Sequence, residues 1–274
     1  PSMRFDFAHI AVPFRMQPGL HRLAAGTPQL TPLAPGSPLY TEKQRVFAAG
    51  ASRFCEPGFD PTPAIKSIAA HATTTGLGGQ FGPEAALELA FEEDLAVLDA
   101  ASGTVPWLCV CVPSHWAPED KLGQSLAAIH GPVADNAALL AATRGLTQLV
   151  GSGGHWERFV WTVTPASRYD QHPHRQARTP WPATADAETF AQQCYLRAER
   201  QTFLPVGQGT QQAVFTIRVM LQPLAQAVQT SPQAARLHDA LASMSDAVVA
   251  YKNLAPARPL LLRWLATRMA SGRP

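Results

Sequence analysis

Two histidines, His115 and His130, lie fifteen residues apart in the segment PSHWAPEDKLGQSLAAIHGPV. His130 follows the apolar turn LAAI and precedes Gly131-Pro132, so we expect it at the end of a helix. A histidine there can face a cavity and offer one ring nitrogen to a metal, while a carbonyl holds the other. A satisfied core residue or a helix-end cation fits the same pattern. His115 follows the strand-like run VCV, and a structural role in a turn suits it better.

A charged stretch, YLRAERQTF at residues 195–203, is the second group that could do chemistry. Alternation along a strand places Arg197, Glu199 and Gln201 on one face. The other face then receives Leu196, Ala198, Arg200 and Thr202. The loop LPVGQGTQ separates this strand from QAVFTIRVML at residues 212–221, which predicts an antiparallel hairpin.

The register of this hairpin decides which charges meet. A roughly symmetric loop would set Glu199 opposite Thr216 and Arg197 opposite Arg218, although a slip of one residue would invert the faces. Two arginines and a carboxylate on one face suit a ligand with carboxylate or ammonium groups. A solvated outer face with a cross-strand ion pair is the simpler interpretation of the same pattern.

The remaining histidines and cysteines form no recognisable site. His172 and His174 have no third ligand nearby in sequence, so we interpret them as surface residues. The four cysteines form no CxxC motif, and the alternating Cys109 and Cys111 are interpreted as buried, reduced thiols on one strand face. GxSxG, HExxH, Walker and EF-hand motifs are absent from the sequence.

Composition narrows the class of protein. The 274 residues are 46% hydrophobic and 15% charged, with a net charge of +2 and no basic run, which argues against nucleic-acid binding. The low charge content suits a subunit that buries surface against a partner, or simply a neutral chain rich in alanine and proline. The sequence shows no apolar leader and no uncharged run of membrane-spanning length, so a cytoplasmic location is expected.

The order of predicted elements indicates an α+β fold with an antiparallel sheet and flanking helices. A proline-rich extended arm is expected over residues 1–62. The expected helices lie at residues 63–72, 83–100, 118–129, 134–150 and 185–193, and from residue 231 onward. The expected strands lie at residues 104–112, 157–163, 195–203 and 212–221. Regular strand–helix alternation, which a doubly wound parallel fold would need, is not seen.

Three segments together resemble one known family. They are PFRMQPGLHRL near the N-terminus, PSHWAPEDKLGQSLAAIHGPV, and the hairpin LRAERQTFLPVGQGTQQAVFTIRVMLQPL. The chain resembles the α subunit of haem-dependent oxidative N-demethylase, also called dimethylamine monooxygenase. The resemblance implies a PAS-like, haem-binding core over residues 63–230, followed by C-terminal helices at 231–274. It also implies haem b, O₂, a small secondary amine that yields an aldehyde, and NADPH electrons supplied through a flavin and iron–sulfur reductase subunit.

The resemblance also implies roles for individual residues. His130 becomes the expected axial haem ligand, because it is the histidine of the shared motif. Arg197, Arg200 and Arg218, with Gln201, become expected cofactor-binding residues, since a guanidinium matches a haem propionate. Glu199 becomes the expected catalytic residue, which either holds a protonated amine or only pairs with an arginine.

Departures from the family pattern leave other functions open. The basic insert SRYDQHPHRQARTPW follows the central strand, and the hairpin ends in RVML, without the family's tyrosine. These changes bear on which amine is bound. The alternatives are a haem-binding PAS sensor of gas or redox state without turnover, and a haem-free interaction subunit. A sensor usually carries an output domain, and none is visible in the sequence.

Overall fold

The computed structural model of the chain describes residues 4–16, 19–79, 81, 85–207 and 209–270. Its strands are β1 His21–Arg22, β2 Arg53–Cys55, β3 Asp94–Asp99, β4 Thr104–Cys109, β5 Trp156–Thr164, β6 Tyr195–Pro205 and β7 Gln212–Pro223. Its α-helices are α1 Pro38–Ala48, α2 Thr62–Thr74, α3 Leu87–Ala90, α4 Leu126–His130, α5 Ala137–Gly151, α6 Ala187–Gln192, α7 Leu224–Ala227, α8 Ser231–Ser243, α9 Asp246–Tyr251 and α10 Arg258–Ala270. Two 3₁₀ helices, η1 Phe7–His9 and η2 Pro118–Asp120, complete the described elements.

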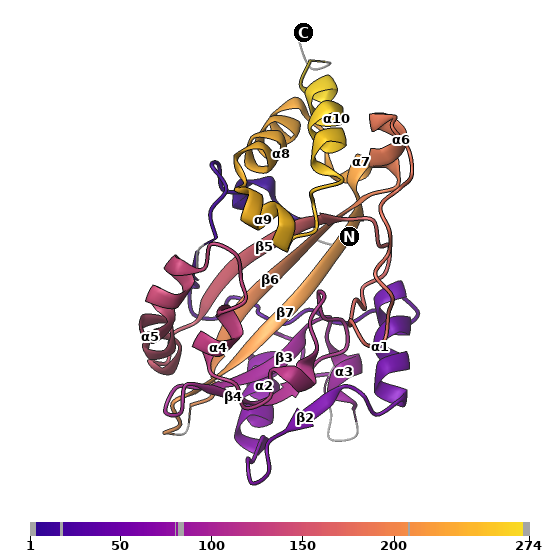
Figure 1. Cartoon of the computed structure of the whole chain (residues 1–274). Coiled ribbons are helices and arrows are strands. Elements are labelled where there is room, and N and C mark those ends of the chain that lie inside the picture. The colour runs from indigo at the N-terminus through magenta and orange to yellow at the C-terminus, as the bar shows by residue number, and fades with distance from the viewer. Residues whose placement is uncertain (1–3, 17–18, 80, 82–84, 208, 271–274) are drawn as a thin grey trace.

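The strands form one seven-stranded sheet in the order β1-β5-β6-β7-β3-β4-β2, in which every pairing is antiparallel. Strands β5, β6 and β7 are the long central members. They extend from the C-terminal helices at one end of the molecule toward β2, β3 and β4 at the other (Figure 1). The predicted α+β class with an antiparallel sheet and flanking helices is therefore confirmed, whereas its PAS-like details stay a prediction.

The two faces of the central strands have different partners. One face, which we call the site face, carries Arg158, Val160 and Thr162 of β5, Arg197, Glu199 and Gln201 of β6, and Ile217, Val219 and Leu221 of β7. Leu126 and Ile129 of α4 pack near its lower part, against Phe203 and Phe215. The opposite face packs its apolar residues against α2, α6, α8 and α10. The site face thus carries the ionisable residues Arg158, Arg197 and Glu199 of these strands.

The hairpin of β6 and β7 is confirmed, but its expected register is wrong. Glu199 lies opposite Val219, and Arg197 lies opposite Leu221. Arg218 lies opposite Arg200, on the opposite face from Glu199. The hairpin turn is not centred where a symmetric loop would place it. No local sequence pattern predicts this difference in register.

The helix expected over residues 83–100 is also wrong in its second half. Pro83 lies outside the described residues, α3 ends at Ala90, and residues 94–99 form the inner strand β3. Because β3 is buried on both faces, its continuous apolar run does not alternate and mimics a helical stripe. The Lys43 ammonium also binds the carbonyls of Phe91, Glu92 and Glu93, which a continuing helix would have used.

Two further expectations need adjustment. The helix expected over residues 118–129 is split into η2 and α4, with Gly123 between them at a φ of 71° that favours glycine. The N-terminal arm contains an unpredicted helix, α1, capped by Ser37 and opened by Pro38. The boundaries proposed at residues 62 and 230 stay predictions.

Candidate functional site

Glu199 lies at the centre of the site face. Glu199 is only 8% exposed, and in the sheet it lies between Val160 of β5 and Val219 of β7. The Ser114 hydroxyl donates a hydrogen bond to Oε1, and Gln201 Nε2 donates one to Oε2 at 2.7 Å. Among the described residues, no cation lies within ion-pair distance of this carboxylate. The carboxylate is therefore oriented by two neutral donors, and its oxygens can accept a further hydrogen bond.

Ser114 joins the two most distinctive segments of the sequence. Besides contacting Glu199, its hydroxyl accepts a hydrogen bond from Arg197 Nε at 2.8 Å. Arg197 is 2% exposed and also donates to the carbonyls of Val112 and Arg168. The guanidinium therefore fixes the loop after β4 to the sheet, so that the Ser114 hydroxyl reaches Glu199.

Two cations lie near Glu199 without forming an ion pair with it. Burial lowers the pKa of Arg158, and the Glu199 charge only partly opposes this effect. Burial likewise lowers the pKa of Lys252 to about 8, although Glu199 raises it and Arg158 lowers it further. The Lys252 ammonium donates to the Trp161 carbonyl at 3.1 Å. The site face thus holds one carboxylate flanked by two incompletely compensated cations.

His130 is the last residue of α4, as the sequence predicted. Its Nδ1 is buried and, within the described part of the chain, has no hydrogen-bond partner. Removal from water lowers the pKa of His130, and the nearby Arg158 and Lys121 lower it further. Arg158 Nε is also buried without a partner among those residues, and Arg158 sits opposite Gln201 on the site face. Arg158 therefore lies near both the His130 imidazole and the Glu199 carboxylate.

The expected cofactor-binding residues are not all brought together. Arg197 and Gln201 lie on the site face, but Arg200 and Arg218 lie on the opposite face. Arg200 Nε pairs with Glu157 at 2.7 Å, and Arg218 Nε pairs with Glu92 at 2.6 Å. Their role in cofactor binding stays a prediction, and the structure does not place these two guanidinium groups beside Glu199.

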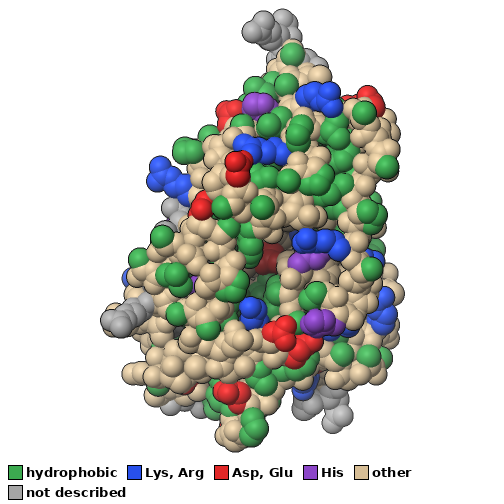
Figure 2. All heavy atoms as spheres, viewed as in Figure 1, with side chains coloured by type: hydrophobic (Ala, Val, Ile, Leu, Met, Phe, Trp, Pro, Cys, Tyr) green, Lys and Arg blue, Asp and Glu red, His purple; other side chains and the backbone are tan. Residues whose placement is uncertain are grey.

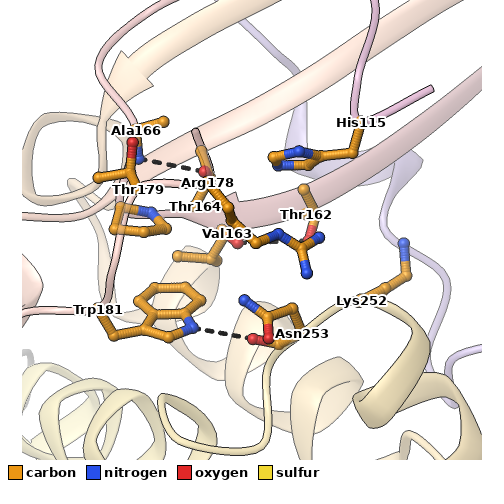
Figure 3. Close-up of a pocket in the computed structure, with 11 residues that line it drawn as sticks. His115, Thr162, Val163, Thr164, Ala166, Arg178, Thr179, Trp181, Lys252 and Asn253 are labelled. Atoms are coloured by element: carbon orange, nitrogen blue, oxygen red, sulfur yellow. Dashed lines mark hydrogen bonds between the residues drawn. The ribbon is translucent and has the colours of Figure 1, made fainter. Parts of the chain in front are cut away.

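A small pocket lies at the upper end of the site face. It is lined by Thr162, Val163 and Thr164 of β5, by Pro165, Ala166, Arg178, Thr179 and Trp181 of the connection to α6, by Lys252 and Asn253 after α9, and by His115 (Figure 3). The space-filling view shows a hollow in the middle of this side of the molecule, with acidic atoms at depth and basic and histidine side chains at its rim (Figure 2).

His115 is more than the turn residue that its position suggested. Its backbone has a φ of 60°, which is uncommon for a residue with a side chain. Partial burial lowers the pKa of His115 to about 4, helped by Arg178, Arg197 and Arg168. The ring is therefore neutral at pH 7 and lines the pocket (Figure 3).

The insert at residues 167–181 is anchored in the structure. His172, expected on the surface, is only 2% exposed and contacts Glu119 at 3.0 Å, whereas His174 is exposed as expected. The buried Asp170 pairs with Arg175, and its backbone N–H donates to Glu42 of α1. These contacts hold the segment that carries Arg178 and Trp181 over the end of the site face.

Several site residues escaped the sequence analysis. Arg158, Lys252 and Ser114 have no distinctive spacing, and they meet only because the sheet and the loop after β4 bring them together. Ser114 had one available signal, since it lies in the same PSHW segment that carries the family resemblance. The predicted buried thiols are confirmed: Cys109 and Cys111 are free and buried, and burial raises the pKa of both.

The buried carboxylate of Glu199, the two cations near it and the imidazole at the end of α4 thus gather on one side of the sheet of this α+β fold. The family model described as "Haem-dependent oxidative N-demethylase, alpha subunit-like" matches residues 68–262, more than half of the chain. The chain belongs to this family. No curated protein matches it. Within the described residues, no helix is long and apolar enough to cross a membrane.

Proposed function

We propose that this protein is a haem-dependent oxidative demethylase that removes a methyl group from a small amine with O₂. The observation that carries the proposal is the Glu199 carboxylate, which is buried, oriented by Ser114 and Gln201, and without an ion-pair partner among the described residues. A buried carboxylate of this kind suits an ammonium group, because burying an unpaired charge is costly. Family membership supplies the expected reaction type.

The proposal of a bound haem rests on two buried nitrogen atoms near the site face, which belong to His130 and Arg158. In the described part of the chain, no three or more His, Cys, Asp or Glu side chains converge as a metal site, but a haem iron needs only an axial ligand. The Nδ1 of His130 is buried and has no hydrogen-bond partner among the described residues. The Nε of Arg158 is likewise buried without a partner among them. His130 would hold the haem iron, and Arg158 would pair with a haem carboxylate. When bound, the haem would supply the redox chemistry with O₂.

The chain's own residues would bind and orient the amine. Glu199 would accept a hydrogen bond from the ammonium form, while Ser114 and Gln201 hold the carboxylate in one orientation. Val160 and Val219, directly beside Glu199 in the ladder, offer apolar contact to the methyl groups. In the balanced reaction, N–CH₃, O₂, two protons and two electrons give N–H, formaldehyde and water. We propose that a separate flavin and iron–sulfur reductase subunit supplies the electrons from NADPH.

The test is formaldehyde release from dimethylamine by haem-loaded protein with a chemical or enzymatic reductant. We expect turnover by the wild type, and a value of kcat/KM about tenfold to a hundredfold lower for Glu199→Gln, mainly through KM, because one charge-assisted hydrogen bond is lost. The matched control, Glu157→Gln, changes a carboxylate on the opposite face and should leave turnover within about threefold. An intact haem spectrum with no formaldehyde would contradict the proposal and favour a sensor.

A further inference from the structure

The pocket at the upper end of the site face has features of its own, separate from Glu199. It encloses about 30 Å³, which is room for two or three water-sized groups. Its walls come from strand β5, the insert and the residue pair after α9 (Figure 3). A group of three heavy atoms fits this space better than a phosphate with five.

The charge of this pocket is positive, and for Lys252 the nearby Glu199 compensates it only in part. Arg178 forms no ion pair among the described residues. The Lys252 ammonium donates to the Trp161 carbonyl and lies near the Phe14 ring. Among the described residues that line the pocket, none is Asp or Glu. Because His115 has a pKa of about 4, it adds a neutral ring and leaves the positive charge to these two cations at pH 7.

Neutral polar groups complete the lining. Thr162 and Thr179 contribute hydroxyls, and Asn253 contributes a side-chain amide. Trp181 forms one wall and is fixed by the hydrogen bond from its Nε1 to the Asn253 carbonyl at 2.9 Å. An arginine fork beside hydroxyl and amide donors is the arrangement that matches a carboxylate.

We propose that this pocket, between Arg178, Lys252 and Thr162, is a binding site for a carboxylate group. The carboxylate could belong to a haem propionate or to an amine substrate that also carries a carboxylate. Thr162 lies two residues along β5 from Val160, the partner of Glu199, which separates the two sites by about 7 Å along the strand. A molecule with an amine and a carboxylate could therefore span them.

The first experiment uses the haem-free protein and does not depend on the proposed function. Ligand-observed NMR titration at pH 7 compares propionate with propionamide, which has the same shape but no charge. We expect propionate to bind and propionamide to bind at least tenfold more weakly. Arg178→Gln should weaken propionate about tenfold, and Lys66→Gln, an exposed change on α2 at the opposite face, should not.

The second arm repeats the titration with haem-loaded protein and identifies the source. Loss of propionate binding on haem loading, together with weaker haem retention by Arg178→Gln, assigns the pocket to a haem carboxylate. Binding that persists assigns it to the substrate, and N-methylglycine should then compete with propionate. Lys252→Gln provides an independent check on the cationic wall.

Three results would overturn the carboxylate site. They are equal binding of propionate and propionamide, an unchanged affinity for propionate in both Arg178→Gln and Lys252→Gln, or tighter binding of inorganic phosphate than of propionate. Each of them can occur whether or not the protein releases formaldehyde, so this proposal and the proposed function can fail separately.

Discussion

The two arginines of β6 have different roles because they lie at different positions in the strand. Arg197 and Arg200 are three residues apart on β6, and alternation sends them to opposite faces. Arg197 is enclosed and donates to Ser114 and two carbonyls, whereas Arg200 pairs with Glu157. One guanidinium therefore orients the site, and the other stabilises the opposite face of the sheet.

Lys252 gives a prediction at the same scale. Its pKa falls from 10.5 to about 8 because burial disfavours its charge. Below about pH 8, Lys252 is charged in both the folded and the unfolded protein. The full cost of burying its charge then lowers the stability of the folded protein. Between about pH 8 and 10.5 the unfolded chain binds more protons than the folded one, so stability rises with pH. From pH 7 to pH 10, the free energy of unfolding of the wild type should rise by on the order of 1 to 2 kcal/mol relative to that of Lys252→Met, after allowance for screening.

Urea unfolding of both proteins at the two pH values measures this difference directly. Comparison with Lys252→Met removes the contribution of other titrating groups, because they are common to both proteins. A free-energy difference that stays constant, or that falls as the pH rises, would show that Lys252 is not held in a desolvated position.

At the scale of elements, local patterns predicted which strands exist but not how they meet. The long hairpin was visible because LRAERQTF and QAVFTIRVML flank a glycine-containing loop. Its register depended on a loop geometry that carries no sequence signal. The inner strand β3 was mistaken for helix, since burial on both faces erased its alternation. Helix α1 was hidden among prolines, although Ser37 and Pro38 are favourable at a helix start.

Lys43 tests how α1 is joined to the sheet. Burial would lower the pKa of this side chain, but Asp94 and other nearby groups raise it overall, so it stays charged. The ammonium is fully buried, contacts Asp94 at 3.3 Å, and binds the three carbonyls before β3. Lys43→Met should cost about 3 to 5 kcal/mol of unfolding free energy, because Asp94 and the carbonyls lose their partner.

The matched control is Lys66→Met, which removes an exposed lysine from α2 and should change stability by less than about 0.5 kcal/mol. Both variants can be compared with the wild type by urea unfolding. A Lys43→Met cost no larger than that of the control would mean that Lys43 does not hold α1 to the start of β3.

At the scale of the whole molecule, the site is assembled from distant segments. The β4–η2 loop supplies Ser114, the hairpin supplies Glu199, and the residues after α9 supply Lys252. The loop is held because the Val112 N–H donates to Asp94 of β3 and the Val112 carbonyl accepts from Arg197. His130 and Glu199 could be singled out from sequence, by helix-end position, strand alternation and family resemblance. Arg158 and Lys252 could not, because only tertiary packing makes them neighbours.

The absorbance spectrum of haem-loaded protein tests the central claim most directly. Protein expressed with sufficient haem should show a Soret band, and His130→Ala should lose or shift it, with added imidazole restoring the wild-type position. The control His174→Ala changes an exposed histidine of the insert and should leave the band unaltered. No Soret band in the wild type, or the same band in His130→Ala as in the wild type, would contradict the account.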